Sequence, residues 1–191
     1  KNIPIFKNAI KTHINSARDS ILHYIVNTGD ANFLNGKQIF IQGSPILKIK
    51  KGIKIGRLSG IVAHHVPFYL KSSRMPSWEV NCIEEWEEKI NAIVEETINQ
   101  NMTLISGIPP WVQMYFEKII EKKGKKIGDV FKNFSLFIYG GVSFKPYKKI
   151  FDELIGRKVN SIEVYPASEG FFAFQDQLDS DSMLLLLNNH I

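Results

Sequence analysis

The fold is decided by three short, mainly apolar runs: MTLI at residues 102–105, LFIY at 136–139 and SIEVY at 161–165. Each run is followed at or close to its end by glycine or proline. Between the runs, apolar residues recur every three or four positions, which predicts helices at 109–123 and 146–155. Short strands that alternate with helices indicate an α/β fold, with a mostly parallel sheet and helices on both of its faces.

The flanking sequence adds elements of the same kind. Residues 50–76 are rich in glycine and proline and show no clear periodicity, so we expect mainly loops there, with short strands as the alternative. Elsewhere the pattern predicts two more helices and three more strands, the helices at 5–27 and 83–100 and the strands at 38–42, 171–174 and 183–187.

The composition narrows the class of protein. Of 191 residues, 44% are hydrophobic and 23% charged, which fits a globular chain and excludes a disordered chain, a collagen or a coiled coil. The single cysteine, Cys82, excludes a disulfide framework and fits a reducing cytoplasm, where we expect the protein to be located. The longest apolar run, residues 183–187, is too short to span a bilayer, so we expect no membrane partner.

The net charge of +5 is mild, although lysines gather at residues 44–57 and 117–132. Nucleic-acid grooves usually mix such charge with arginine and aromatic side chains. The positive charge of these segments comes almost entirely from lysine, so we interpret them as solvated faces and expect no nucleic-acid partner. A basic binding module for anionic partners remains the non-enzymatic alternative.

Ligands of parallel sheets bind beyond the carboxyl ends of the strands, which selects three loops, at residues 106–111, 140–143 and 166–170. In the last loop, the Glu169 carboxylate beside the Ser168 hydroxyl suits Mg²⁺ and a phosphate oxygen, because Mg²⁺ prefers hard oxygen ligands. Tyr165 offers a flat face for a base. The alternative is an ordinary turn or helix cap, with Tyr165 in the core.

The other candidates give weaker signals. Gly140 and Gly141 let a ligand approach the backbone closely, but an ordinary strand-to-helix turn also uses glycine. Trp111 either lines an apolar pocket or begins the buried face of its helix. His64 and His65 are adjacent and point in different directions, which makes a metal site there unconvincing.

Four segments together carry a family resemblance. YGGVSFKPY at 139–147 and EVYPASEGFFA at 163–173 occur in the order seen in the auxin-responsive promoter family of acyl-acid amido synthetases, and GRLSG at 56–60 and ISGIPPW at 105–111 are also similar to it. That family belongs to the adenylate-forming superfamily. The resemblance spans essentially the whole chain, and its most specific part is the Tyr-Pro-Ala-Ser-Glu-Gly block.

The resemblance implies an ATP- and Mg²⁺-dependent ligase that activates a small carboxylic acid as an acyl-adenylate and transfers it to the amine of an amino acid. It also implies roles for single residues. Glu169 and Ser168 would be catalytic, with Glu169 on the metal ion and Ser168 near the α-phosphate. Tyr165 would stack on the adenine, and the loop of Gly140, Gly141 and Val142 would lie against its other face. Lys1 would end the phosphate loop, and Trp111, His64 and His65 would line the acid pocket.

Three features that the resemblance implies have no counterpart in the sequence: the start of the phosphate loop, the later Tyr/Arg-Gly-Asp stretch whose Asp holds the ribose, and the C-terminal domain. We therefore expect residues 1–191 to be the central part of the N-terminal adenylation domain, inactive by themselves. Pro166 also replaces a residue that is often small in relatives. An acyl-CoA or other thioester-forming ligase with the same first step stays an alternative, as does a degenerate enzyme without activity.

Overall fold

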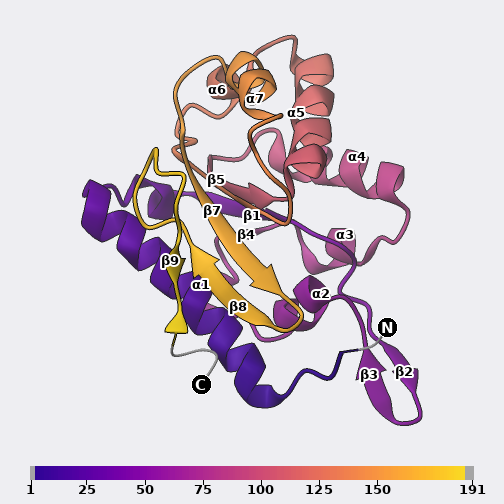
Figure 1. Ribbon diagram of the computed structural model, residues 1–191. Helices are drawn as coiled ribbons and strands as arrows, with labels where there is room; N and C mark the ends of the chain where they lie inside the picture. Colours follow the sequence, from indigo (N-terminus) through magenta and orange to yellow (C-terminus); the bar gives the residue numbers. More distant parts are fainter. Residues whose placement is uncertain (1–2, 188–191) are drawn as a thin grey trace.

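The computed structural model describes residues 3–187, which form an α/β domain around one large sheet (Figure 1). Among these residues the large sheet has seven strands in the order β4-β1-β5-β6-β7-β8-β9, and β2 and β3 form a separate hairpin. The strands are β1 Lys37–Ile41, β2 Lys48–Lys50, β3 Ile53–Ile55, β4 Arg74–Met75, β5 Met102–Gly107, β6 Leu136–Gly140, β7 Asn160–Ala167, β8 Gly170–Phe174 and β9 Leu184–Leu185.

The sheet is mostly parallel, as the sequence predicted. Strands β4, β1, β5, β6 and β7 pair in parallel, whereas β8 and β9 continue the sheet in antiparallel fashion. The pairs Ile41↔Gly107 and Gly140↔Val164 bring the carboxyl ends of neighbouring strands to one edge. We call this edge the rim.

Helices cover both faces of the sheet. Helix α1 (Lys7–Thr28) packs along β7 and β8 on one face, which Figure 1 shows as the long indigo helix. On the other face lie α4 (Trp86–Thr97), α5 (Pro109–Lys123), α6 (Ile127–Val130) and α7 (Lys148–Ile155). The smaller helical segments are η1 Asn32–Asn35, α2 Leu58–Ala63, η2 Phe68–Leu70 and α3 Trp78–Cys82.

Side chains of one strand alternate between two separate cores. On β6, Leu136 and Ile138 face the core that Tyr24 of α1 joins, while Phe137 and Tyr139 face the core beneath α5 and α7. Both cores consist mainly of aliphatic and aromatic side chains. This explains why the strand sequences are apolar runs rather than alternating ones.

The predicted helix at 83–100 is shorter than expected and is preceded by a separate one. Helix α3 ends at Cys82, and α4 begins at Trp86 because Glu85 acts as its N-cap. The Glu85 carboxylate accepts hydrogen bonds from the backbone N–H groups of Glu87, at 3.1 Å, and Glu88, at 2.6 Å. Such a cap satisfies donors that have no partner inside the helix.

Two further segments differ from the expectation. The loop-rich region contains the β2–β3 hairpin, whose turn places Lys51 and Gly52 at positive φ, 51° and 76°. Hydrophobic periodicity does not reveal this hairpin, because its strands are three residues each and largely exposed. The predicted strand at 183–187 is reduced to β9. Among residues 3–187, no helix combines the length and apolarity needed to cross a membrane.

Candidate functional site

Two of the three predicted loops lie side by side at the rim. Strands β5 and β6 are parallel neighbours, so the segments that follow them leave the sheet at the same edge. A Cβ atom built on Gly141 would lie 3.7 Å from Cγ1 of Ile108, which places the glycine loop directly against the loop after β5. The sequence prediction that these loops lie near each other is confirmed.

Backbone geometry explains why residues 140 and 141 are both glycine. A Cβ atom on Gly140 would lie 2.3 Å from the carbonyl oxygen of Val164, so only glycine permits this approach of β6 to β7. Gly141 has φ +85°, a conformation that other residues rarely adopt. The result is a loop whose next residue, Val142, is 41% exposed at the rim.

The third predicted segment forms the turn of a hairpin between β7 and the strand predicted at 171–174. Strand β7 continues to Ala167, and Ser168 and Glu169 form the turn into β8, which begins at Gly170. Because Gly140 pairs with Val164, strand β7 continues three residues, or about 10 Å, beyond this pair before the turn begins. The hairpin therefore rises above the rim and carries Glu169 on its tip.

The side chains of this hairpin are accessible. Tyr165 is 55% exposed, and its ring lies 5.4 Å from that of Phe172, so it is not a core residue. Glu169 is exposed and forms no ion pair within residues 3–187. No cluster of three or more metal-ligating side chains is found in that range. Any ion held by Glu169 would take its other ligands from water or a bound molecule.

Two of the three residues predicted for an acid pocket, Trp111 and His64, pack against other parts of the domain. Trp111, in the first turn of α5, packs on Trp86 with ring centroids 4.8 Å apart. The Nε2 atom of His64 lies 2.9 Å from the carbonyl oxygen of Pro45, and its ring packs edge-on against Trp78. His65 is exposed. Lys1, predicted at the phosphate loop, lies outside the described residues.

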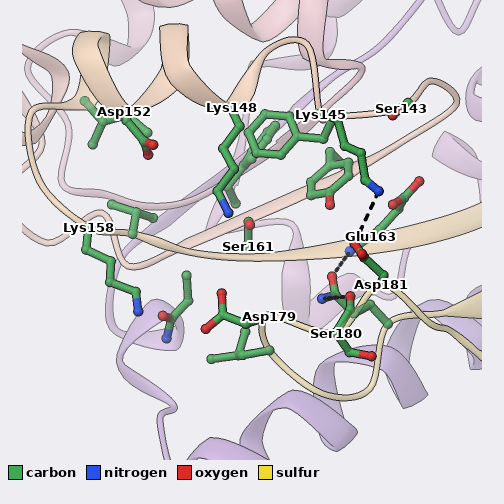
Figure 2. A pocket seen from close by; sticks show the side chains of 18 of the residues that line it. Ser143, Lys145, Lys148, Asp152, Lys158, Ser161, Glu163, Asp179, Ser180 and Asp181 are labelled. Atoms are coloured by element: carbon green, nitrogen blue, oxygen red, sulfur yellow. Dashed lines mark hydrogen bonds and ion pairs between the residues drawn. The ribbon is translucent and has the colours of Figure 1, made fainter.

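A cavity of about 720 Å³ lies beside the rim on the α7 face of the sheet (Figure 2). Its floor is β6 and β7, and residues 175–183 form its outer wall. We call this segment the strap. Ser143 lines the cavity at its rim end, whereas the predicted site residues of the hairpin and the glycine pair do not line it.

Sequence reasoning missed the polar floor of this cavity. Ser161 and Glu163 both line it, and they stand two residues apart on β7, so they share one face of the strand. Two polar residues at this spacing in an otherwise apolar strand were the available signal. Burial raises the pKa of Glu163, and the hydroxyl of Tyr139 opposes this by hydrogen bonding to its carboxylate. Burial also raises the pKa of Tyr139, to about 12.

A mostly parallel sheet with glycine-bearing loops along its carboxyl rim defines an α/β domain of the ligand-binding type. Residues 9–159 match the profile described as "GH3 family N-terminal domain", which covers most of the chain. The chain therefore belongs to the GH3 family, and this confirms the resemblance drawn from its motifs. Members of this family are adenylating ligases.

The match includes the glycine pair, Trp111 and both histidines of the predicted site, but it ends before the β7–β8 hairpin. A search of curated proteins found no match to the chain.

Proposed function

We propose that this chain is part of an ATP-dependent acid–amino acid ligase. In the first step, a carboxylate oxygen attacks the α-phosphorus of ATP, which forms an acyl-adenylate and releases pyrophosphate. In the second, an amino acid amine attacks the acyl carbonyl, which forms the amide and releases AMP. Activation is needed because a free carboxylate resists attack by an amine, whereas AMP is a good leaving group.

The observation that carries the proposal is the juxtaposition at the rim. The glycine loop after β6 ends beside β7, and β7 continues past it into a hairpin with an exposed tyrosine, a serine and an exposed glutamate. A nucleotide bound between the glycine loop and the hairpin would contact the backbone of the loop on one side and the ring of Tyr165 on the other. Together with membership of the GH3 family, this arrangement supports nucleotide binding at the rim.

We assign the residues as follows. Tyr165 and the loop of Gly140 to Val142 would hold the adenine between them, and Ser168 would donate a hydrogen bond to the α-phosphate. Glu169 would hold Mg²⁺, whose charge offsets that of the phosphates during attack. A single accessible carboxylate suits this ion, since Mg²⁺ commonly binds one or two carboxylates and completes its shell with phosphate oxygens and water.

The acid substrate is proposed to bind on the other side of the glycine loop. Trp111 follows the loop that contacts Gly141, and it carries the largest apolar surface among the predicted pocket residues. His64 and His65 follow the last residue of α2. They would contribute to the same pocket from a position further along the rim.

The test is Glu169→Gln in the complete protein, assayed for Mg²⁺-dependent pyrophosphate release with a panel of carboxylic acids. We expect a loss of at least about 100-fold, the usual scale for removing a charge that stabilises a transition state. Glu121→Gln, an exposed glutamate on α5, is the matched control and should retain activity. Unchanged release in Glu169→Gln would remove this residue from the mechanism.

The second half-reaction needs its own measurement. With the acyl-adenylate formed, amide production from amino acids supports the proposed acceptor. Formation of a thioester from coenzyme A, without amide, would replace it with the thioester-forming alternative. Hydroxylamine trapping reports the first step in either case.

A further inference from the structure

The β2–β3 hairpin projects from the domain, away from the large sheet (Figure 1). Within residues 3–187 its two strands pair with each other and with no other strand. Its base is fixed on both sides. Before β2, the hydroxyl of Ser44 donates to the carbonyl oxygen of Cys82 at 3.2 Å. After β3, the side chain of Arg57 lies against Gly43, where an added Cβ atom would be 3.0 Å from the arginine Cδ atom. Residues 49–54 form the outer end of this fixed projection, which we call the basic tip.

The hairpin carries only positive charge. No aspartate or glutamate occurs between residues 44 and 57, whereas lysines occupy positions 48, 50, 51 and 54. All four lysines are exposed, and none of them forms an ion pair within residues 3–187. The charge of the hairpin therefore favours an anionic partner.

Large apolar side chains are exposed among these lysines. Ile49 of β2 is 73% exposed and Ile53 of β3 is 67% exposed. The register pairs Ile49 with Lys54 and Lys50 with Ile53, and directly opposite residues of an antiparallel pair share a face. The two isoleucines therefore lie on opposite faces of the hairpin, each beside a lysine. A solvated face gains nothing from isoleucines in water, so the basic tip fits a partner that is both anionic and apolar.

Nucleic acid matches only the charge of the basic tip. Single-stranded nucleic acid is usually bound by aromatic rings that stack on bases, together with arginine. Residues 46–55 contain no arginine and no aromatic residue. Isoleucine cannot replace a ring in such stacking.

A second copy of the chain is also a poor match. Its most acidic helix is α4, but Glu87 and Glu95 of that helix already pair with Lys118 and Lys122 of α5. A folded protein surface would also cover one face of the hairpin and leave the isoleucine of the other face in water. The surface of a bilayer surrounds an inserted tip on both faces.

We propose that the basic tip inserts end-on into the surface of membranes that contain anionic phospholipids. Ile49 and Ile53 would enter the boundary between the headgroups and the acyl chains, where exposed apolar side chains are removed from water. The lysines would lie among the anionic headgroups. This contact is confined to the bilayer surface and needs no membrane-spanning segment. It requires neither ATP nor the ligase activity proposed above.

The experiment is co-sedimentation of the complete protein with two kinds of vesicle, one of phosphatidylcholine alone and one of an equal mixture of phosphatidylcholine and phosphatidylserine. We expect at least tenfold tighter binding to the mixed vesicles, because each lysine near an anionic surface strengthens binding about fivefold. Added salt should weaken this binding, because counterions screen the lysines.

Substitutions in the basic tip separate its two contributions. Ile49→Thr combined with Ile53→Thr should weaken binding to mixed vesicles at least tenfold, and threonine preserves the preference for a strand. Lys50→Gln and Lys54→Gln should each weaken it about fivefold. Thermal unfolding checks that each variant is folded, and the lysine variants test the proposal independently if the threonine variant is not.

Matched controls lie elsewhere on the surface. Val26→Ser replaces an exposed aliphatic residue of α1, and Lys125→Gln replaces an exposed lysine beyond α5. Both variants should bind as the wild type does. In a Cys82→Ser background, an environment-sensitive fluorophore on Lys51→Cys should report transfer out of water when mixed vesicles are added, whereas the same fluorophore on Lys125→Cys should not.

Equal binding to neutral and mixed vesicles would overturn the proposal, and so would unchanged binding in the tip variants. Binding of single-stranded RNA without binding of vesicles would assign the tip to nucleic acid instead. Self-association that depends on the tip, again without vesicle binding, would assign it to a second copy. Pyrophosphate release is measured separately and without vesicles, so failure of the ligase proposal and failure of this one are distinguishable.

Discussion

Replacing Lys89 by methionine should remove a pH dependence of stability that the wild-type protein carries in the alkaline range. Lys89 is 2% exposed, which is rare for a lysine. Its ammonium donates to the carbonyl oxygen of Asn81 at 2.6 Å and to the Oδ1 atom of Asn81 at 3.0 Å. Both acceptors are neutral, and within residues 3–187 no carboxylate forms an ion pair with it.

Burial lowers the pKa of Lys89 from 10.5 to about 8. At about 1.4 kcal/mol for each pH unit, keeping this charge buried costs about 3 kcal/mol of folding free energy at neutral pH. Since the folded pKa is depressed, the unfolded chain binds the proton more tightly, and the free energy of unfolding rises with pH from about 8 towards 10.5. Linkage over pH 7 to 9.5 gives a rise of about 2 kcal/mol.

The assay is urea unfolding at a series of pH values between about 7 and 9.5, with the free energy extrapolated to water. The wild-type background and the Lys89→Met variant both carry Cys82→Ser. Burial raises the pKa of the Cys82 thiol, and its titration would overlap with that of Lys89. Other groups contribute equally to both proteins, so the difference between the curves isolates Lys89. The control is Lys149→Met on the exposed side of α7, whose curve should run parallel to the wild type.

Lys89→Met also leaves the two acceptor atoms of Asn81 without a donor, which costs about 1–3 kcal/mol and lowers its curve by a constant amount. The diagnostic quantity is therefore the change with pH and not the value at one pH. Parallel curves for the wild type and Lys89→Met would refute the reasoning, because they would show that burial does not perturb this ammonium.

Three further predictions concern the packing of the domain, each measured by urea unfolding. Gly140→Ala places a Cβ atom against the carbonyl oxygen of Val164 and should destabilise the rim by more than about 1 kcal/mol. Ser77→Ala removes the N-cap of α3, whose hydroxyl accepts from the N–H of Val80 at 3.2 Å, and should cost about 1 kcal/mol. Phe116→Ala empties a fully buried site between α5 and the sheet and should cost about 3–5 kcal/mol. Losses below about 0.5 kcal/mol would contradict each of them.

The sequence was most informative where local signals agree with tertiary packing. Helix α5 begins and ends where predicted, because Pro109 suits the first turn and Gly124 adopts the left-handed conformation after the last, with φ 62°. The order of strands and helices along the chain was enough to predict the parallel sheet and its covered faces. Helix α3 was missed, and the start of α4 was predicted at residue 83, three residues too early, because Ile83 keeps the apolar spacing of the helix ahead of the cap formed by Glu85.

The candidate site was predicted in part. Locating loops at the carboxyl ends of strands follows from parallel pairing alone, and the structure brings two of the three together. The strand before the third loop was expected to end at Tyr165, but it continues through Pro166 to Ala167, with a register shift between Tyr165 and Pro166. Such irregularities let β7 tolerate a proline and continue into the hairpin.

The sequence by itself determined the fold class, the family and the edge of the sheet at which the first two candidate loops lie, since these depend on local periodicity and short motifs. Only the tertiary structure decided that Glu169 stands on a projecting turn and that residues 175–183 return to close a charged cavity over β7. Both depend on strand register and on contacts between segments distant along the chain. Hydrophobic periodicity carries no information about either, because it records which face of an element is buried and not which segment buries it.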